Sequence, residues 1–228
     1  MKILISDFDY TFFDNNYENN ILATQKFVND GNIFIIATGR NLNQIKEEIT
    51  DKDVPYFFLI CNDGAVIYNR KDEILYEKNI DNEIGQKAFK KLLDSKYISE
   101  AFIDDMEGYQ IYDYSKINKI VGKPKNEKKA KQLLDEILEN NEFTGYMSEN
   151  WLNIINSEVS KGNAIKYILE KYKLDDEEIY VVGDNINDIS MLDMYTPYIM
   201  EESSPEILKK YPNKVKNIEE LINILTSK

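Results

Sequence analysis

The sequence predicts an α/β fold built on a mostly parallel sheet, with a smaller α+β segment inserted between its two halves. Strand-like apolar runs alternate with segments whose apolar residues recur at helical spacing, which is typical of parallel strands joined by helices. Near residue 80 this pattern changes to short strand-like runs with two helical segments, and the alternation resumes near residue 156. We therefore expect a core domain of residues 1–80 and 156–228 and an inserted α+β domain of residues 81–155.

The first part of the core carries clear strand and helix signals. Ile33–Ala37 is apolar and rich in β-branched residues, as expected of a strand buried on both faces. Asn41 suits the N-cap of a helix that runs through Ile49, and Gly31 suits the end of a helix over residues 21–30. The other expected elements are strands at residues 2–6, 57–60, 66–68 and 74–76, the last two forming a hairpin after a tight turn at residues 62–65.

The inserted segment is expected to contain two amphipathic helices, at residues 83–93 and 126–138. Its expected strands are residues 98–103, 109–114, 117–121, 143–147 and 151–155. Seven lysines lie between Lys116 and Lys131, in contrast to the acidic chain as a whole. We interpret them as a solvated strand edge and helix face, and the alternative is a rim that attracts an anionic substrate.

The second part of the core resumes the alternation of helices and strands. A helix is expected over residues 163–172, after the segment Ser160-Lys161-Gly162, and a buried strand over residues 179–182. A helix from residue 189, a short strand at residues 198–200 and a terminal helix at residues 218–225 complete the prediction.

The composition excludes several kinds of chemistry. The 228 residues include no histidine, which excludes Ser-His-Asp hydrolysis, phosphohistidine intermediates and histidine-rich zinc sites. The single cysteine, Cys61, ends an apolar run and is expected to be a buried thiol. It is not part of a Cys-x5-Arg phosphatase loop, because position 67 is Ile67. Catalysis therefore has to use Asp, Lys, Ser or Thr side chains.

Charge and hydropathy restrict the partners. The formal net charge of −13 argues against nucleic-acid binding, which needs basic surface, so a small-molecule partner is expected. No apolar run approaches the length of a transmembrane helix, and the N-terminal residues lack the pattern of a signal peptide. We therefore expect a cytoplasmic protein without a membrane partner. Monomer and homodimer are equally compatible with the sequence.

Two carboxylates, Asp7 and Asp9, end the first expected strand. Alternate side chains of an extended backbone share a face, so both carboxylates are expected on one side, where a cation would offset their repulsion. Either aspartate alone would be explained by a turn at the strand end. The pair indicates a metal site only if further polar groups lie near it.

Three further polar clusters lie just after an expected strand or at the start of an expected helix. Thr38 follows the strand of residues 33–37, Lys161 precedes a helix, and Asp184 and Asp188 follow the strand of residues 179–182. Ligands of open α/β sheets bind at the carboxyl ends of the strands, so these clusters are expected to converge. Taken singly, each has a simpler explanation as a helix cap, a surface lysine, a turn or an N-terminal helix charge.

In this order the clusters resemble the motifs of the haloacid dehalogenase superfamily of Mg²⁺-dependent phosphohydrolases. They are most similar to its Cof-type branch, in which a type IIB α/β cap is inserted between the second and third motifs of a Rossmann-like core. The insertion at residues 81–155 occupies the corresponding place, although it is short for that branch. The matching segments are Asp7-Phe8-Asp9-Tyr10-Thr11, Ala37-Thr38-Gly39-Arg40, Asn62-Asp63-Gly64-Ala65, Ser160-Lys161-Gly162 and Gly183-Asp184-Asn185-Ile186-Asn187-Asp188.

The resemblance implies a role for each matching residue. Asp7 would attack phosphorus to form an aspartyl-phosphate, and Asp9 would be the general acid and base. Thr38 and Lys161 would contact the phosphoryl oxygens during catalysis. The metal ligands implied for Mg²⁺ are Asp7, Asp9 through its backbone carbonyl, Asp184 and Asp188, the last directly or through water. The substrate-binding residues implied are Thr38, Gly39, Arg40, Asn62, Asp63, Gly64, Lys161 and Asn187.

The function implied is hydrolysis of a small phosphorylated metabolite such as a sugar phosphate. A phosphomutase or phosphotransferase of the same superfamily is the first alternative, and a phospho-receiver-like signalling domain is the second. A receiver domain carries its phosphoacceptor on the third strand and has no inserted domain, so the order of motifs disfavours it. One residue departs from the superfamily pattern: Tyr10 stands where glycine is usual, so either the loop differs or the tyrosine projects toward the substrate.

Overall fold

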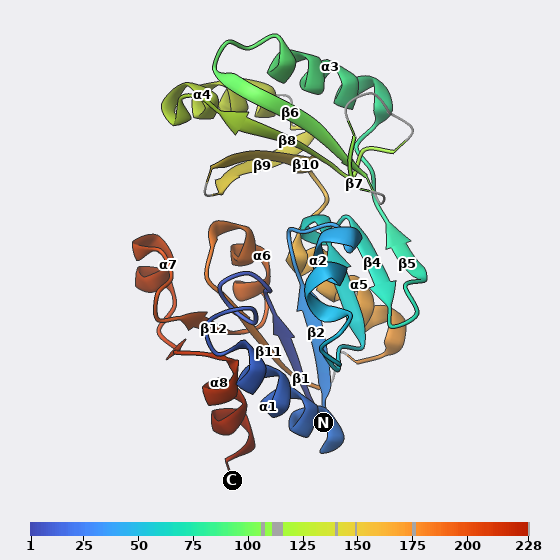
Figure 1. The fold of residues 1–228 in the computed structure, drawn as a ribbon, viewed down its shortest axis with the longest axis vertical. Coiled ribbons are helices and arrows are strands. Elements are labelled where there is room, and N and C mark those ends of the chain that lie inside the picture. Colours follow the sequence, from blue (N-terminus) through green and yellow to red (C-terminus); the bar gives the residue numbers. More distant parts are fainter. Residues whose placement is uncertain (106–107, 111–115, 140, 149, 175–176, 228) are drawn as a thin grey trace.

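The computed structural model describes residues 1–105, 108–110, 116–139, 141–148, 150–174 and 177–227, and two sheets lie one above the other along its long axis (Figure 1). The larger sheet has the strand order β13 (Lys214–Val215), β12 (Thr196–Met200), β11 (Glu178–Gly183), β1 (Lys2–Ser6), β2 (Ile33–Ala37), β3 (Phe58–Cys61), β4 (Val66–Asn69) and β5 (Ile74–Glu77). Pairing is parallel from β13 to β3 and antiparallel for β4 and β5. The predicted α/β fold with a mostly parallel sheet is confirmed.

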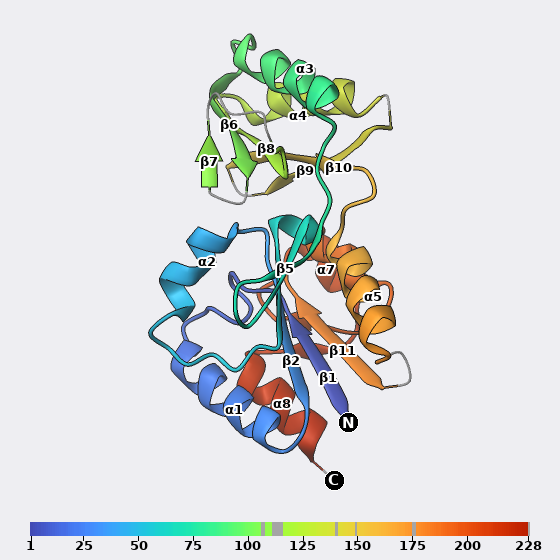
Figure 2. The same ribbon diagram turned by 90° about the vertical axis from the view of Figure 1, so that its right-hand side faces the viewer.

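Helices cover both faces of the larger sheet (Figure 2). On one face lie α1 (Tyr17–Asn29), α2 (Leu42–Ile49) and α8 (Ile218–Thr226), and on the other lie α5 (Lys161–Tyr172), α6 (Ile189–Leu192) and α7 (Pro205–Lys210). Strand β1 shows how the sequence serves both layers, because Leu4 packs with the first group of helices and Ile3 and Ile5 pack with the second. Two apolar layers explain why strand β2 is apolar at every position.

The smaller sheet has its own apolar core. Its strand order is β7 (Gly108–Gln110), β6 (Ile98–Asp105), β8 (Lys119–Pro124), β10 (Trp151–Asn156) and β9 (Phe143–Ser148), and all pairs are antiparallel. Helices α3 (Asn82–Leu93) and α4 (Glu127–Leu138) pack on the face turned away from the larger sheet (Figure 1). The opposite face is turned toward the carboxyl ends of the core strands, so its side chains are available to a site between the two sheets.

Two core helices begin earlier than the sequence predicts. The prediction starts too late in each because a polar residue is buried on the inner face of the helix near its start. Helix α1 begins at Tyr17, and the amide of its buried Asn20 donates to the Phe12 carbonyl at 3.0 Å. Helix α5 begins at Lys161, where the Ser160 hydroxyl caps the backbone N–H of Asn163 at 3.1 Å. A buried asparagine or lysine breaks the apolar repeat from which a helix is predicted.

The other predicted elements agree with the structure to within a few residues at their ends. Two short elements, α7 and β13, were not predicted, and α7 fully buries only Ile207. Strand β7 covers the start of the strand predicted at residues 109–114, whose remaining residues lie outside the described part of the chain. Among the described helices, none has both the length and the apolar character needed to cross a membrane.

Candidate active site

Three carboxylates meet at the carboxyl ends of β1 and β11. Asp7 follows β1, Asp184 and Asp188 follow β11, and one carboxylate oxygen of each lies within 4.8 Å of the others. The parallel pairing of Ser6 with Val182 brings the two strand ends together. The convergence of Asp7 with Asp184 and Asp188 that was expected from strand order is present.

Lys161 supplies the positive charge of this cluster. It is the first residue of α5 and is fully buried, and its Nζ lies 2.5 Å from Asp7 Oδ1 and 2.6 Å from Asp188 Oδ1. The second oxygen of Asp188 accepts the backbone N–H groups of Asp184 and Asn185, each at 3.0 Å. Asp188 therefore fixes both the lysine and the loop that carries Asp184.

The loop after β11 can bring the Asp188 carboxylate close to the end of that strand because residue 183 is a glycine. A Cβ atom at Gly183 would overlap the Asp188 carboxylate. On the other side of the cluster, the Thr11 hydroxyl approaches Asp184 Oδ1 at 3.4 Å. The loop after β1 thus contacts the Asp184 carboxylate.

The electrostatics of the cluster favour a bound cation. Burial raises the pKa of Asp7 well above its ordinary value, although the Lys161 ammonium opposes the shift. Burial and the neighbouring charge of Asp188 raise the pKa of Asp184 to about 7. Three carboxylates against one ammonium leave excess negative charge, and carboxylate oxygens are the ligands that hard divalent cations take. The donor set therefore fits such an ion, with Asp7 and Asp184 facing the open side.

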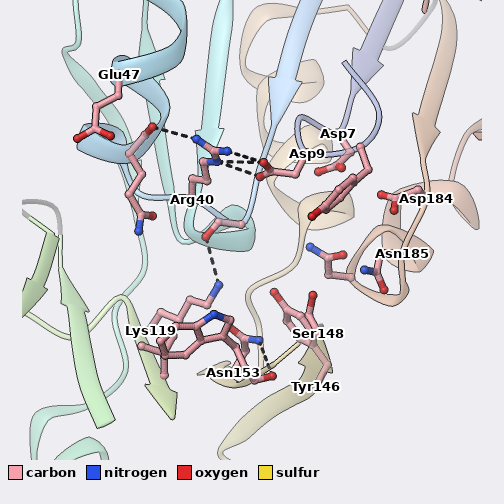
Figure 3. Close-up of a pocket in the computed structure, with 16 residues that line it drawn as sticks. Asp7, Asp9, Arg40, Glu47, Lys119, Tyr146, Ser148, Asn153, Asp184 and Asn185 are labelled. Carbon is pink, nitrogen blue, oxygen red and sulfur yellow. Dashed lines mark hydrogen bonds and ion pairs between the residues drawn. The ribbon is translucent and has the colours of Figure 1, made fainter. Parts of the chain in front are cut away.

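Asp9 is held by a different cation. Arg40, which follows β2, donates from Nε to Asp9 Oδ2 at 3.0 Å and from Nη2 to Oδ1 at 2.6 Å. The same guanidinium lies 3.4 Å from Glu48 and over the rings of Phe8 and Phe13, 5.3 and 5.7 Å from their centroids. Asp7 and Asp9 are therefore oriented independently of one another (Figure 3).

Thr38 lies beside the strand end that carries Asp7. Strand β1 pairs with β2 so that Ser6 is opposite Ile36, which places Thr38 two residues beyond that pair. Its side chain is fully buried, and its hydroxyl accepts the backbone N–H of Arg40 at 3.1 Å. In this arrangement Thr38 shapes the turn that presents Arg40.

The loop after β3 brings a further carboxylate, that of the buried Asp63, to the site. Asn62, Asp63 and Gly64 have φ values of 51°, 57° and 109°, and a Cβ at Gly64 would overlap the Ser160 carbonyl. This left-handed turn aims the Asp63 carboxylate at Asn187, whose Nδ2 lies 2.9 Å away. Asn62 and Gly64 are buried beneath it, so they support the loop and do not face the open side.

Asp63 also binds two side chains of the smaller sheet. Its Oδ2 accepts from Lys119 Nζ at 2.7 Å and from the Tyr146 hydroxyl at 2.7 Å. Lys119 is the one member of the lysine-rich segment that turns inward; it is buried and also donates to the Gly39 carbonyl at 3.2 Å. For this lysine the expectation of a solvated face is wrong.

A cleft of about 420 Å³ lies between the two sheets. Figure 3 shows Asp7, Asp9 and Arg40 on the core side and Lys119 and Tyr146 on the opposite side. Of the residues predicted for the site, those lining the cleft are Asp7, Asp9, Gly39, Arg40, Asp184 and Asn187, and those behind its wall are Thr38, Asn62, Asp63, Gly64, Lys161 and Asp188.

Apart from Lys119, which lies in the lysine-rich segment, the cleft residues of the smaller sheet were not singled out from the sequence. They are Lys119, Val121, Tyr146, Ser148, Trp151 and Asn153, and the core adds Gln44, Glu47 and Asn185. Alternation along β10 carries the signal, because Leu152 and Ile154 pack under the helices and Trp151 and Asn153 face the cleft. Period-two patterning could therefore have identified the face, once the covered side was known.

Tyr10 lines the mouth of the cleft with an exposed ring. Its backbone is left-handed, with φ of 58°, and its side chain is 65% exposed. The loop thus keeps a conformation that glycine adopts freely while carrying an aromatic side chain. Of the two outcomes expected for this position, the structure shows a side chain that projects toward the cleft.

Known proteins resemble this chain in sequence and in fold. Residues 4–113 and 95–220 match the family of haloacid dehalogenase-like hydrolases. A protein named "Putative phosphatase" from Buchnera aphidicola subsp. Baizongia pistaciae is 30% identical over 242 residues, which cover 91% of this chain and 89% of the relative.

Solved structures extend the comparison to the whole fold. A haloacid dehalogenase-like hydrolase from B. subtilis has a TM-score of 0.85 at 17% identity, covering 99% of each chain. A subclass IIB sugar phosphatase of the superfamily has a TM-score of 0.78 at 18% identity, covering 96% of this chain and 95% of the other. Because the sequence match spans nearly the whole chain, the protein belongs to the haloacid dehalogenase-like hydrolase family.

Proposed function

We propose that the protein is a Mg²⁺-dependent phosphatase of small phosphomonoesters, such as sugar phosphates, with Asp7 as nucleophile and Asp9 as general acid and base. One observation carries the proposal: the Asp7 carboxylate borders an open cleft while a buried lysine and two further aspartates surround it. Relatives named as phosphatases support the same activity.

The proposed reaction has two steps. Asp7 attacks phosphorus, the bond to the leaving oxygen breaks, and Asp9 donates a proton to that oxygen. Asp9 then accepts a proton from water, which attacks the phosphorus of the aspartyl-phosphate and releases inorganic phosphate and free Asp7. Arg40 binds both oxygens of Asp9, so this ion pair must loosen as Asp9 turns to the substrate.

Asp7 and Asp184 would hold the metal, with Asp188 positioning them through Lys161 and the loop backbone. When bound, Mg²⁺ lets an anionic nucleophile approach an anionic phosphate. Lys161 holds Asp7 in one orientation and adds positive charge beside the phosphoryl group. In the proposed function residues 81–155 act as a cap that closes over the leaving group.

Release of inorganic phosphate tests the proposal. We expect hydrolysis of members of a panel of sugar phosphates, phosphoglycolate, pyridoxal phosphate and nucleotides when Mg²⁺ is present, and loss of activity after chelation. Full activity after exhaustive chelation would overturn the metal assignment. Transfer of the phosphoryl group to a second sugar without release of phosphate would instead identify a phosphomutase.

A further inference from the structure

Lys119 crosses from the smaller sheet to the core, where a carboxylate neutralises it. Its Nζ lies 2.7 Å from Asp63 Oδ2 and 3.2 Å from the Gly39 carbonyl. The Lys119 and Asp63 side chains are 7% and 2% exposed, so the pair is shielded from bulk water. A shielded ion pair presents little net charge to a ligand beside it.

The Asp63 carboxylate is held in its charged form. Burial opposes its ionisation, but the ammonium groups of Lys119 and Lys161 and the hydrogen bond from Asn187 outweigh burial and lower the pKa of Asp63 to about 2. Asp63 is therefore ionised at neutral pH. The charge of Lys119 is balanced whether or not a ligand is present.

The other charged residues that line the cleft also leave it without excess positive charge. Among the described residues that line it, the second cation is Arg40, which already binds Asp9 and Glu48. Glu47 adds a negative charge on the core side (Figure 3). The remaining cleft residues of the smaller sheet that carry hydrogen-bonding groups are neutral, namely Tyr146, Ser148, Trp151 and Asn153.

We propose that Asp63 determines specificity by neutralising Lys119, so that the cleft prefers phosphomonoesters with an uncharged hydrogen-bonding leaving group over those with an anionic one. The inference rests on the proposed phosphatase function and adds the charge class of its substrates. Asp63 lies behind the cleft wall, so it acts on the substrate through Lys119.

The test compares two probes that differ mainly in one charge. Glycerol 3-phosphate ends in an uncharged alcohol, and 3-phosphoglycerate carries a carboxylate at the same place. We expect the wild-type protein to prefer glycerol 3-phosphate in kcat/KM by about tenfold or more, an effect between that of one unfavourable charge contact in bulk water and that of one near a protein surface. Asp63→Asn, which removes the carboxylate bound to Lys119, should reduce this ratio by about tenfold.

The reciprocal variant separates this role from simple structural support. Lys119→Met leaves the Asp63 charge without its partner, so we expect the preference for glycerol 3-phosphate to increase. The double variant should return the ratio to near that of the wild type. A general loss of packing would move both single variants in the same direction, and that result, or an unchanged ratio in either variant, would overturn the inference.

Binding provides a measurement that does not depend on turnover. The rise in melting temperature caused by each probe, measured with Mg²⁺ for all four proteins, should follow the same order as the kinetic ratios. If no protein hydrolyses either probe or any member of the panel but the binding order holds, the proposed function fails and the charge selection stands. If hydrolysis occurs without the opposite shifts, the selection fails alone. Absence of binding and turnover with both probes and with the whole panel in all four proteins would overturn both.

Discussion

Asp7 and Asp9 are two residues apart in the sequence, and the structure assigns them to different partners. Asp7 is bound by Lys161 inside the core, whereas Asp9 is bound by Arg40 at the cleft. Their different surroundings suit different tasks, since a nucleophile needs a fixed orientation and a proton donor has to reach the leaving oxygen. Substitution of Asp7 and substitution of Asp9 should therefore block different steps of the reaction.

We expect Asp7→Asn to abolish turnover because no nucleophilic carboxylate remains. Asp9→Asn should still become phosphorylated by a substrate with a good leaving group, such as p-nitrophenyl phosphate, but should release phosphate slowly because proton transfer to and from water is lost. Rapid-quench measurement of the first turnover distinguishes the two. A burst of leaving group from Asp7→Asn would contradict the assignment.

Lys161→Met tests the buried cation. Two carboxylates would lose their partner, so we expect kcat to fall by on the order of 100-fold for every ester alike. The melting temperature should also fall, because removal of one partner of a buried ion pair is destabilising. The control is Lys166→Met on the same helix, whose exposed pair with Glu170 at 3.8 Å contributes little. A loss confined to some substrates would argue for a specificity role.

At the scale of elements, buried strands and capped helices were predictable and polar inner faces were not. Strand β2 and helix α2 have the predicted bounds, because an unbroken apolar run and the Asn41 capping box are local signals. The start of α5 was missed because Lys161, buried in the structure, looks like a surface residue in the sequence. A charged side chain is buried only if its partners are nearby, and Asp188 is 27 residues away.

The site was predictable to a similar extent. Residues at the ends of parallel strands could be collected from the sequence, because the fold brings such ends together. The partners of Asp63 could not, since Lys119 and Tyr146 are 56 and 83 residues away on a different sheet. Which side chains of the smaller sheet reach Asp63 depends on how the two sheets meet, and no local sequence pattern encodes that geometry.

The contact between α2 and β6 predicts a pH-dependent stability. Asn41 Nδ2 donates to Asp104 Oδ1 at 2.9 Å, and burial raises the pKa of Asp104 to about 7 against the opposing charge of Lys119 and this hydrogen bond. The negative charges of Asp105 and Asp63 add to the rise. The folded protein therefore binds a proton at pH values where the unfolded carboxyl, with a pKa of about 3.9, has lost it.

The sign of the effect follows from the raised pKa. The stabilisation is full below the unfolded pKa and is lost as the pH rises through about 7. Asp104→Asn, which keeps an acceptor for Asn41 and cannot ionise, should gain stability relative to the wild type between about pH 5 and about pH 8, on the order of 1–3 kcal/mol. Thermal unfolding across this range measures the difference. A difference that is constant with pH would contradict the assignment.

At the scale of the whole molecule, cation binding should raise the melting temperature of the protein. A ligand that binds only the folded state raises the melting temperature with its concentration. We expect Mg²⁺ to stabilise the wild-type protein in this way and to have a much smaller effect on Asp184→Asn, which lacks a carboxylate on the open side. Asp193→Asn, a carboxylate of the same half of the core paired with Lys210 on the surface, is the control. Equal Mg²⁺ shifts in all three proteins would place the ion elsewhere.

Residues of the larger and the smaller sheet are expected to affect substrates differently, the first all alike and the second according to the leaving group. In the proposed function core residues contact the phosphoryl group common to all substrates, whereas Trp151 and Asn153, which line the cleft from the smaller sheet, would face the leaving group. We expect Trp151→Ala and Asn153→Ala to change the rank order of a substrate panel. If both variants lower every substrate by one common factor, the smaller sheet acts as a lid without selecting.

The two chain crossings between the sheets run side by side and are tied to one another (Figure 2). Asn156 Nδ2 donates to the Asn79 carbonyl at 3.0 Å, and an ion pair joins Lys78 and Glu158. We expect two adjacent tethers to act as a hinge that bends about the line through both and resists torsion. A covalent crosslink between positions 78 and 158 should therefore leave turnover intact, whereas a crosslink between positions 63 and 119 should stop it by fixing the two sheets at their present separation. Inactivation by the first crosslink would show that opening requires the tethers to separate.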